Sequence, residues 1–461
     1  MEQIVKNFIE ELGYDSSVID TKHESRVKDW LNWYQGKTKY HNYYVYNGKK
    51  KVKKTLKSLN IATQACGDLS DFYFNEKLEI TINNEKVSEQ IKECLKQNDF
   101  LYNSNKLMQL VKALGTGAIV PYLDNDVLKI NYIDATGIVI LEADNTDIKS
   151  VLLWSKRNTL KGKEIKINAH ILEEDGYKIY NRIYNEINGT YTEVEIDENL
   201  REIESTVLPK FSILKTPEVN NIDINSAYGI SSFANATDTI LAIDNAYDSL
   251  DNEISNGRKR IYIKGGATQF NTDSDGTMTP IFDSSETVYY ELPGNEKDPL
   301  VTESNGDLRI DAITTSLQSQ INLFTSKIGL GHEYYRFKDN QAYVNTTNII
   351  SANSDTYRKI KKQENIITNA IRDLCYAIAE LIGVTEEFEV SVDYDDSIIE
   401  DSEQTRKQAM SEYNSKLISK AQYYRDVYKL DDNSAIDFAK KMNEEIQNET
   451  ITDGSEFDIT E

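Results

Sequence analysis

The chain has 461 residues and a formal net charge of −24, with 39% hydrophobic and 28% charged residues. This length is enough for two to four structural units built around a real core. The negative charge works against tight, non-specific DNA binding, which depends on lysine and arginine displacing counterions from phosphates. The negative charge does not exclude a protein through which DNA passes without being bound tightly.

Several classes of protein are disfavoured by composition. No run approaches 18 apolar residues, so no membrane-spanning segment is expected, and the amphipathic N-terminus lacks the apolar stretch of a signal peptide. Three scattered cysteines (Cys66, Cys94 and Cys375) fit a reducing cytosol better than a disulfide framework. The four histidines fit no metal-ligand spacing, and no nucleophile–histidine–acid arrangement is apparent. We therefore expect no enzyme, no metal and no cofactor.

The first 225 residues have the mixed pattern of an α+β unit. An amphipathic helix at the N-terminus is followed by an apolar anchor around Trp30 and Trp33. Asn47-Gly48 predicts a two-residue hairpin turn between tyrosine-rich and lysine-rich strands. A helix is expected at about 58–74, and strands are expected at 78–82, 127–133, 137–141, 150–155, 168–172 and 178–184.

The pattern changes at residue 226. Apolar residues then recur with spacings 3-4-3-4-3-4, which predicts a helix that packs along its whole length against other helices and ends at Gly257. Ser231 or Ser232 is the expected cap at its start. About 25 residues make a rod of roughly 37 Å. The seam consists of Phe233, Ala236, Ile240, Ile243, Tyr247, Leu250 and Ile254.

A second rod of similar length is predicted from an N-cap at Asp307 to Gly329. Between the two rods, residues 258–304 are rich in Gly, Asp and Thr and contain strand patterns, so the order is rod, small β-rich module, rod. An aromatic and basic loop follows, then a third long helix at about 347–381, a strand at 386–394 and short acidic helices. The stripe of the second rod consists of Ile310, Ile313, Leu317, Ile321, Phe324 and Ile328.

Two basic segments stand out in this acidic chain. Arg258, Lys259, Arg260 and Lys264 cluster where the first rod enters the β-rich module. Eight lysines lie between residues 37 and 57 with no acid among them, on a predicted hairpin where half of the side chains simply face water. For the lysines at 37–57, the functional alternative to facing water is contact with phosphate. For the cluster at 258–264, the functional alternative is a role at an interface or near DNA.

Three further motifs favour structural interpretations. The segment 271–283 resembles a calcium loop, but Phe282 stands where a bidentate glutamate must close the shell, which favours a tight turn. Gly115–Ala118 lacks the lysine of a phosphate loop and predicts close packing of a helix on a strand. Six acids in 393–403 favour a solvated acidic face.

The order of these parts, together with the stretches "DWLNWYQGKTKYHNYYVYNGKKKVKKTLKSLNIATQACGDL" and "SAYGISSFANATDTILAIDNAYDSLDNEI", resembles the portal proteins of tailed bacteriophages of the siphophage type over roughly residues 25 to 440. The resemblance implies an α+β portal-type fold with an α/β wing, a two-helix stem, a β-rich clip, a tunnel loop and a helical crown. The implied boundaries are 1–225 for the wing, 226–257 and 306–329 for the stem helices, 258–305 for the clip, 330–346 for the tunnel loop, 347–385 for the long helix, and 386–461 for the crown and acidic tail.

The resemblance also implies a role in the virion. Such proteins form a ring, expected here to have twelve subunits, at one capsid vertex, through which double-stranded DNA is packaged by the terminase motor and later ejected. The implied partners are DNA, the terminase large subunit, head-completion or adaptor proteins, and the major capsid and scaffolding proteins, with assembly in the bacterial host cytoplasm. No membrane partner is implied.

Roles for individual residues follow from the same resemblance. Tyr335, Arg336 and Lys338 are expected on a loop that faces the duplex, with Gly329 and Gly331 as its hinge. The cluster Arg258, Lys259, Arg260 and Lys264 is expected at the clip end, where motor or adaptor docks. Two alternatives are a non-ring subunit of a phage tail or baseplate, which would form tubes or fibres, and a metal-dependent nuclease using Asp393 and Asp395.

Overall fold

The computed structural model describes the residues in the ranges 2–46, 49–124, 127–159, 162–257, 260–264, 270–272, 275–276, 278–280, 289–292, 301–304, 307–332, 334–335, 346–394, 409–428, 430 and 434–442. The chain divides into two compact units. The first unit comprises Met1–Tyr343 and Arg358–Val392, and the second comprises Val344–Tyr357 and Asp393–Glu461. Helices and strands are mixed along the first unit, as the predicted α+β class requires.

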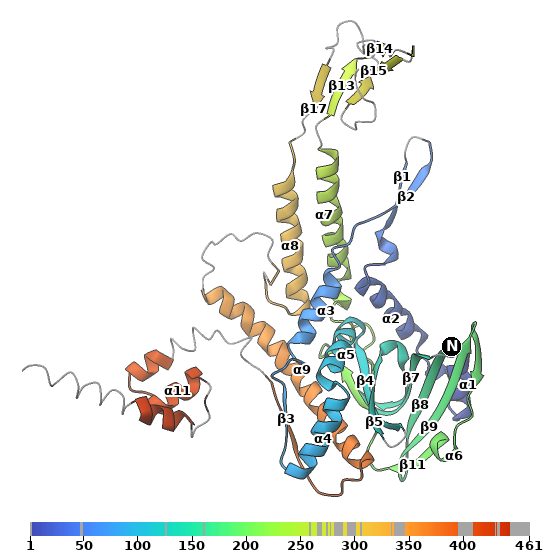
Figure 1. Cartoon of the computed structure of the whole chain (residues 1–461), viewed down its shortest axis with the longest axis vertical. Helices are drawn as coiled ribbons and strands as arrows, with labels where there is room; N and C mark the ends of the chain where they lie inside the picture. The colour runs from blue at the N-terminus through green and yellow to red at the C-terminus, as the bar shows by residue number, and fades with distance from the viewer. Residues whose placement is uncertain are drawn as a thin grey trace, which may run out of the picture. The chain divides into compact units, whose positions relative to one another are not determined.

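A six-stranded antiparallel sheet forms one part of the first unit (Figure 1). Its apolar residues alternate along the central strands, so that Leu152 faces one core while Val151 and Leu153 face another. Helix α1 (Glu2–Glu11) covers the first face through Val5, Phe8 and Ile9. The strands are β6 (Ile138–Asp144), β7 (Asp147–Thr159), β8 (Gly162–Glu173), β9 (Gly176–Ile187) and β10 (Thr190–Glu193) in order, with β11 (Glu202–Thr206) also paired to β9.

A three-stranded sheet contributes to the second core. It has the order β12-β4-β5, with β4 at Thr116–Asp124, β5 at Val127–Asp134 and β12 at Ser212–Lys215. Six successive residues of β4 are buried, so the strand lacks the alternation that identified its neighbours. Periodicity therefore did not predict β4, and only the motif at Gly115–Ala118 indicated a strand at its start. The predicted strands at 127–133, 137–141, 150–155, 168–172 and 178–184 are confirmed.

The predicted close packing at Gly115–Ala118 is confirmed. Helix α5 (Phe100–Leu114) ends at Gly115, which has φ +92° and leads directly into β4. A Cβ on Gly115 would lie 2.5 Å from the backbone oxygen of Gly229, and one on Gly117 would lie 2.6 Å from Val111 Cγ2. Only glycine fits a left-handed position in such close contact with another backbone.

Helices make the other major core of this unit. Helix α2 (Thr21–Tyr34) contributes Trp30 and Trp33, the predicted apolar anchor, and α3 (Ile61–Asp71) occupies the middle of the helix expected at 58–74. Helix α4 (Glu85–Gln97) precedes α5 in the chain. Strand β3 (Glu79–Ile82) pairs with β18 (Val390–Asp393) in a two-stranded sheet. These are the strands expected at 78–82 and 386–394, and both are confirmed.

The predicted hairpin exists, but its turn is longer than expected. Strand β1 (Asn42–Tyr46) pairs with β2 (Lys51–Thr55), and Tyr46 lies opposite Lys51. This register leaves four residues between the strands, so the prediction of a two-residue turn is wrong. Asn47 and Gly48 themselves lie outside the described residues.

The third long helix is confirmed as α9, Thr346–Leu381. Its residues from 358 onward belong to the first unit, where Ile367, Ile371, Leu374 and Ile378 of the predicted stripe are buried. In the second unit, α11 (Lys420–Tyr428) holds Tyr424 against Phe438, with ring centroids 5.0 Å apart. The acidic segment 395–403 lies outside the described residues.

Candidate functional site: the helix pair and its anchors

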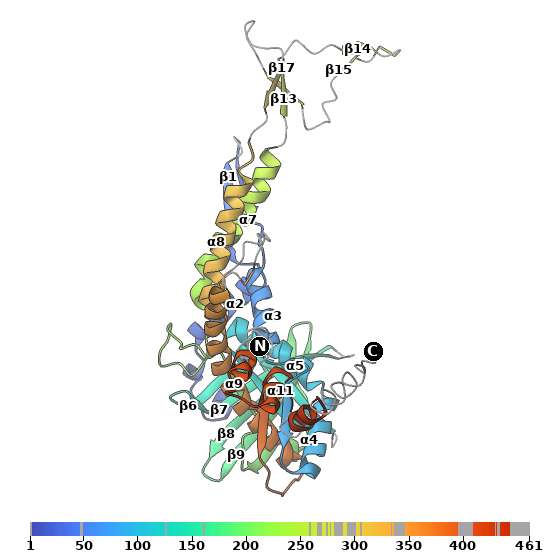
Figure 2. The same cartoon turned by 90° about the vertical axis from the view of Figure 1, so that its left-hand side faces the viewer.

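Two helices of similar length, α7 (Thr237–Asn256) and α8 (Ile310–Ile328), lie side by side and antiparallel, as both views show (Figures 1 and 2). Near one end, Lys327 Nζ donates to Thr239 Oγ1 at 2.8 Å. At the other end, Arg309 Nη2 lies 2.9 Å from Glu253 Oε2. The two predicted rods are therefore confirmed as helices and form one pair.

The starts of both helices differ from the prediction. Asp307 is not the cap of α8: Arg309 occupies that position, and its backbone N–H donates to Glu253 Oε1 at 3.0 Å. In a capping box the side chain at the third helical residue accepts from this N–H, whereas here the acceptor comes from the other helix. A 3-10 turn, Ala234–Ala236, precedes α7, and neither element has a side-chain cap. Ser231 Oγ accepts from the Phe233 N–H at 3.3 Å, before the turn, so the prediction that Ser231 or Ser232 caps the helix is wrong.

The half of the helix pair that lies near Lys327 and Thr239, here called the proximal half, is buried within its own subunit. Its apolar stripe joins the core formed by α2, α3 and α5. Two striped helices of similar length are expected from sequence to find their burial only among copies of themselves, and the structure shows that this expectation is wrong for the proximal half. The buried residues are Phe233, Ala236, Ile240, Ile243, Leu317, Ile321, Phe324 and Ile328.

The half near Glu253 and Arg309, here called the distal half, continues the same stripe without burying it. Ile254 is 49% exposed, and Leu308, just before α8, is 45% exposed. Tyr247, Leu250, Ile310 and Ile313 are only partly buried. The distal half therefore presents apolar side chains that its own subunit does not cover.

A buried carboxylate joins α7 to the segment that precedes α3. Asp244 accepts from the Leu59 N–H at 2.8 Å and from Ser58 Oγ at 3.1 Å, and His41 Nε2 lies 2.8 Å from its Oδ2. Burial raises the pKa of Asp244, and these donors oppose the rise. This contact was not predicted from the sequence, although an acid between Ile243 and Tyr247 of an apolar seam is a detectable signal.

The same segment is attached to α7 one and two turns further on. The Lys57 N–H donates to Asp248 Oδ1 at 3.1 Å, and Lys57 Nζ lies 2.7 Å from Asp251 Oδ2. Helix α7 carries five acids and no base, so it is an acidic element whose flank is partly neutralised by the chain at 57–59.

Of the predicted loop, Tyr335 is described and is held on both sides. Its hydroxyl donates to Asp68 Oδ2 at 2.6 Å, and its carbonyl accepts from Gln318 Nε2 at 2.7 Å. Burial raises the pKa of the Tyr335 hydroxyl, and the bond to Asp68 adds to the rise. Arg336 and Lys338 lie outside the described residues.

The predicted hinge begins with a well-defined helix end. Gly329 has φ +91°, and its N–H donates to the Thr325 carbonyl at 3.0 Å, which closes α8 in the left-handed manner that glycine favours. A Cβ at Gly329 would lie 2.2 Å from Lys359 Cδ. Gly331 follows in the described part of the chain, and the pivoting of this segment stays a prediction.

The predicted basic cluster is described only in part. Arg260 and Lys264 are the ends of β13 (Arg260–Lys264), which pairs with β16 (Tyr289–Leu292) on one side and β17 (Val301–Ser304) on the other. A β-rich module between the two rods is thus present. Arg258 and Lys259 lie outside the described residues, as do parts of the segment that resembles a calcium loop.

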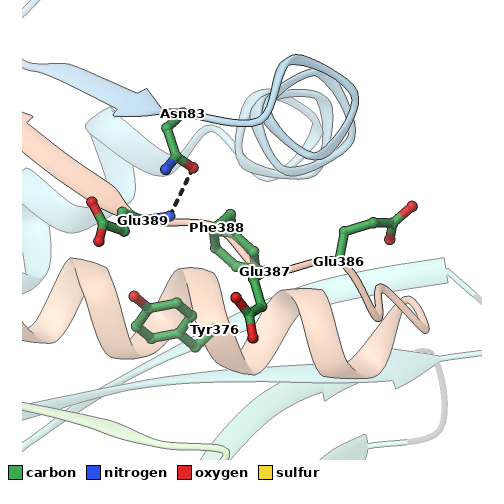
Figure 3. Close-up of a pocket in the computed structure, with 6 residues that line it drawn as sticks. All are labelled: Asn83, Tyr376, Glu386, Glu387, Phe388 and Glu389. Carbon is green, nitrogen blue, oxygen red and sulfur yellow. Dashed lines mark hydrogen bonds between the residues drawn. The ribbon is translucent and has the colours of Figure 1, made fainter.

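Several cavities lie away from the helix pair, and two of them are described here by their lining residues. One, of about 600 Å³, lies beside the β3–β18 pairing, where the Glu389 N–H donates to Asn83 Oδ1 and Phe388 packs on Tyr376 (Figure 3). The other, of about 280 Å³, is lined by His23, which stacks on Tyr228 and whose pKa burial lowers to about 4. Neither cavity contains a residue to which the sequence analysis assigned a role.

The described part of the chain contains neither a candidate metal site nor a helix that could span a membrane. No group of three His, Cys, Asp or Glu side chains there is placed to hold a metal ion. No described helix is both long and apolar enough to cross a bilayer. The helix pair has a distal end at which apolar and acidic side chains are left partly or wholly exposed.

The described chain thus combines an α+β unit with a helix pair and a β-rich module inserted between the two helices. The family model described as phage portal protein, SPP1 Gp6-like, matches residues 17–449, nearly the whole chain. The chain belongs to this family of phage portal proteins, which are structural, non-enzymatic capsid-vertex proteins. A search of curated proteins returned no match.

Proposed function

We propose that the protein forms a closed ring at one capsid vertex and that double-stranded DNA is packaged and ejected through the channel of this ring. The observation that carries the proposal is the distal half of the α7–α8 pair, where the subunit leaves its own apolar stripe partly exposed. The chain's membership of the portal family supports the same proposal. A single helix pair cannot cover both sides of this end, whereas a ring of such pairs can. Twelve subunits are the proposed number.

In this proposal the helix pair is the stem of the portal. Residues 1–225 make up the wing, 258–305 the clip, 330–346 the tunnel loop, and 386–461 the crown and tail. The family match favours this assignment over a tail or baseplate subunit. A net charge of −24 on each subunit supports a conduit, because a channel that repels phosphates does not hold a sliding duplex.

The proposed contacts with DNA and partners involve the sparse cations. Tyr335, Arg336 and Lys338 lie on the loop that faces the duplex, and Gly329 and Gly331 are its hinge. Arg258, Lys259, Arg260 and Lys264 form the docking site for the terminase or an adaptor protein at the clip end. Capsid and scaffolding proteins contact the assembled ring.

Negative-stain electron microscopy and native mass spectrometry of the purified protein test the ring. We expect closed rings with a central hole and a mass that is an integral multiple of the 52.7 kDa subunit. A stable monomer at micromolar concentration, in buffers that support assembly, would overturn the proposal. For the loop, the double variant R336A/K338A is expected to assemble rings that package less DNA, and unaltered packaging would remove these residues from the mechanism.

A further inference from the structure

The hairpin formed by β1 and β2, residues 42–55, is here called the arm. We propose that the arm of one copy packs against the distal half of the α7–α8 pair of the next copy and fastens neighbouring subunits together. This inference rests on the proposed ring and names the contact by which the ring closes.

The arm lacks a core of its own. Eight of its ten strand residues are exposed, and Tyr44 and Tyr46 are exposed by 67% and 65%. A two-stranded hairpin is only marginally stable in water unless a further strand or a helix covers it. The arm therefore needs a surface to cover it, and its long side chains are suited to an interface.

Its two faces differ in chemistry. Residues directly opposite each other in an antiparallel pair share a face, so Tyr44 and Tyr46 lie with Lys53 and Lys51 on one side. The other side carries Tyr43 and the pair Val45–Val52, with Lys54 at its edge. One side thus combines aromatic rings with charge, while the other is mainly apolar.

The charge of the arm is opposite to that of the proposed acceptor. The segment 37–57 contains eight lysines and no acid, whereas the distal half of α7 carries Asp248, Asp251 and Glu253 and no base. Lys57 and Arg309 of the same subunit already contact these acids, but the Asp251 side chain stays 46% exposed. Among the residues that the structure describes, Lys51, Lys53 and Lys54 make no ion pair, so their charges are available to a neighbour. Complementary charge of this kind steers association and fixes orientation.

The acceptor surface also supplies the apolar contact that the arm needs. The partly buried stripe from Tyr247 to Ile254 runs along α7, and Ile310 and Ile313 continue it on α8. Val45, which is 38% exposed, matches this surface in character. A nucleic acid would use the lysines but leave the valines and the helix stripe uncovered, so a second copy is the favoured occupant.

The attachment of the arm explains why the acceptor belongs to another copy. Lys57 and Leu59, at the base of the arm, already hold the flank of their own α7 through Asp248, Asp251 and Asp244. The arm therefore departs from one side of its own helix pair. A contact from this side to a different surface on the next copy is heterologous, and heterologous contacts that close generate rings.

A zero-length carbodiimide cross-link tests the contact directly. Unlabelled and ¹⁵N-labelled proteins are mixed before assembly, cross-linked, digested with chymotrypsin and analysed by mass spectrometry. We expect Lys51, Lys53 or Lys54 joined to carboxylates of 237–256 in pairs of mixed isotope composition. Lys57–Asp251 serves as an internal control and is expected only in pairs of one isotope. Arm cross-links confined to one isotope, or none to α7, would overturn the inference.

Charge reversal tests the energetic importance of the arm. The variant K51E/K53E/K54E is expected to raise the concentration needed for half-assembly, measured by light scattering, at least tenfold, with an unchanged melting temperature for the subunit. The matched control is K22E/K92E/K163E, which reverses three other exposed lysines and is expected to assemble like the wild type.

The outcomes separate this inference from the proposed function. Wild-type protein that forms no ring removes the function and the inference together. Wild-type rings combined with normal assembly of K51E/K53E/K54E remove the inference alone. If that variant assembles normally but binds a fluorescent DNA duplex more weakly, the arm is a nucleic-acid contact and the inference is wrong.

Discussion

The proximal and distal halves of the α7–α8 pair share one sequence pattern but have different surroundings. In the proximal half, Ile243, Ile321 and Phe324 are fully buried by the subunit's own helices. In the distal half, the same spacing places Ile254 in a position where it is half exposed. A periodic stripe therefore identifies the face of a helix that will be covered, but it does not identify which chain covers it.

This difference separates two roles within one element. The proximal half anchors the helices to the folded subunit, and its loss is a loss of folding. The distal half is the surface that we propose for assembly, and its loss is a loss of oligomers. Substitutions along the pair should therefore change either the free energy of unfolding or the free energy of assembly, according to position.

The largest effect is expected from truncating the proximal core. Phe324→Ala removes a fully buried ring and is expected to lower the free energy of unfolding by about 3–5 kcal/mol, because it leaves a cavity. Leu323→Ala is the matched control: this neighbour is 54% exposed, and a change within about 0.5 kcal/mol is expected. Denaturant unfolding followed by circular dichroism measures both. Equal effects at the two positions would contradict the assigned orientation of α8.

The buried carboxylate of the proximal half is the next test. Asp244→Ala leaves the Leu59 N–H, Ser58 and His41 without an acceptor and is expected to cost on the order of 2–4 kcal/mol of unfolding free energy. Asp251→Ala removes only the exposed contact with Lys57, so a change of about 1 kcal/mol or less is expected. The same unfolding measurement applies. A harmless Asp244→Ala would show that this network does not fix α7 to the subunit.

Substitutions in the distal half are expected to change the free energy of assembly and not the free energy of unfolding. Ile254→Asn is expected to leave the unfolding free energy within about 0.5 kcal/mol of the wild type. It should weaken each subunit contact by about 1 kcal/mol, because an apolar side chain no longer enters the interface. Leu123→Asn alters an exposed apolar residue of β4, 43% accessible and outside the helix pair, and should assemble normally. Analytical ultracentrifugation distinguishes the variants, and unimpaired assembly of Ile254→Asn would exclude this residue from the interface.

Local periodicity predicted the helix pair, the long helix α9 and most strands, because their stripes are regular and long. It failed at β4, where burial on both faces removes the alternation, and at Asp307, because the acceptor at the start of α8 comes from Glu253 on another helix. Contacts between distant segments, such as Tyr335 with Asp68 and Asp244 with Leu59, depend on the tertiary fold. No local pattern specifies such partners.

The smallest expected effect concerns the ion pair at the distal end. Hydrogen bonds from Arg309 lower the pKa of Glu253 from its ordinary value of 4.5 to about 2. The depressed pKa means that the pair's stabilisation is fully present above about pH 4.5 and is lost as the pH falls toward 2. Because the pair is close to solvent, it is expected to change the hydrogen-exchange protection of amides near residue 253 only roughly two- to fivefold.

Glu253→Gln tests this pair by removing its ionisation. Protection in the variant should be lower than in the wild type at pH 5, and the difference should vanish as the pH approaches 2, after correction for intrinsic exchange. Amides near residue 243 serve as the control, because the proximal core holds them regardless of this pair. A difference that persists unchanged at pH 2 would mean that Glu253 acts by packing and not by charge. A difference that spreads to residue 243 would show that the two halves of α7 open together, which would contradict the division of the helix pair into an anchored and an open half.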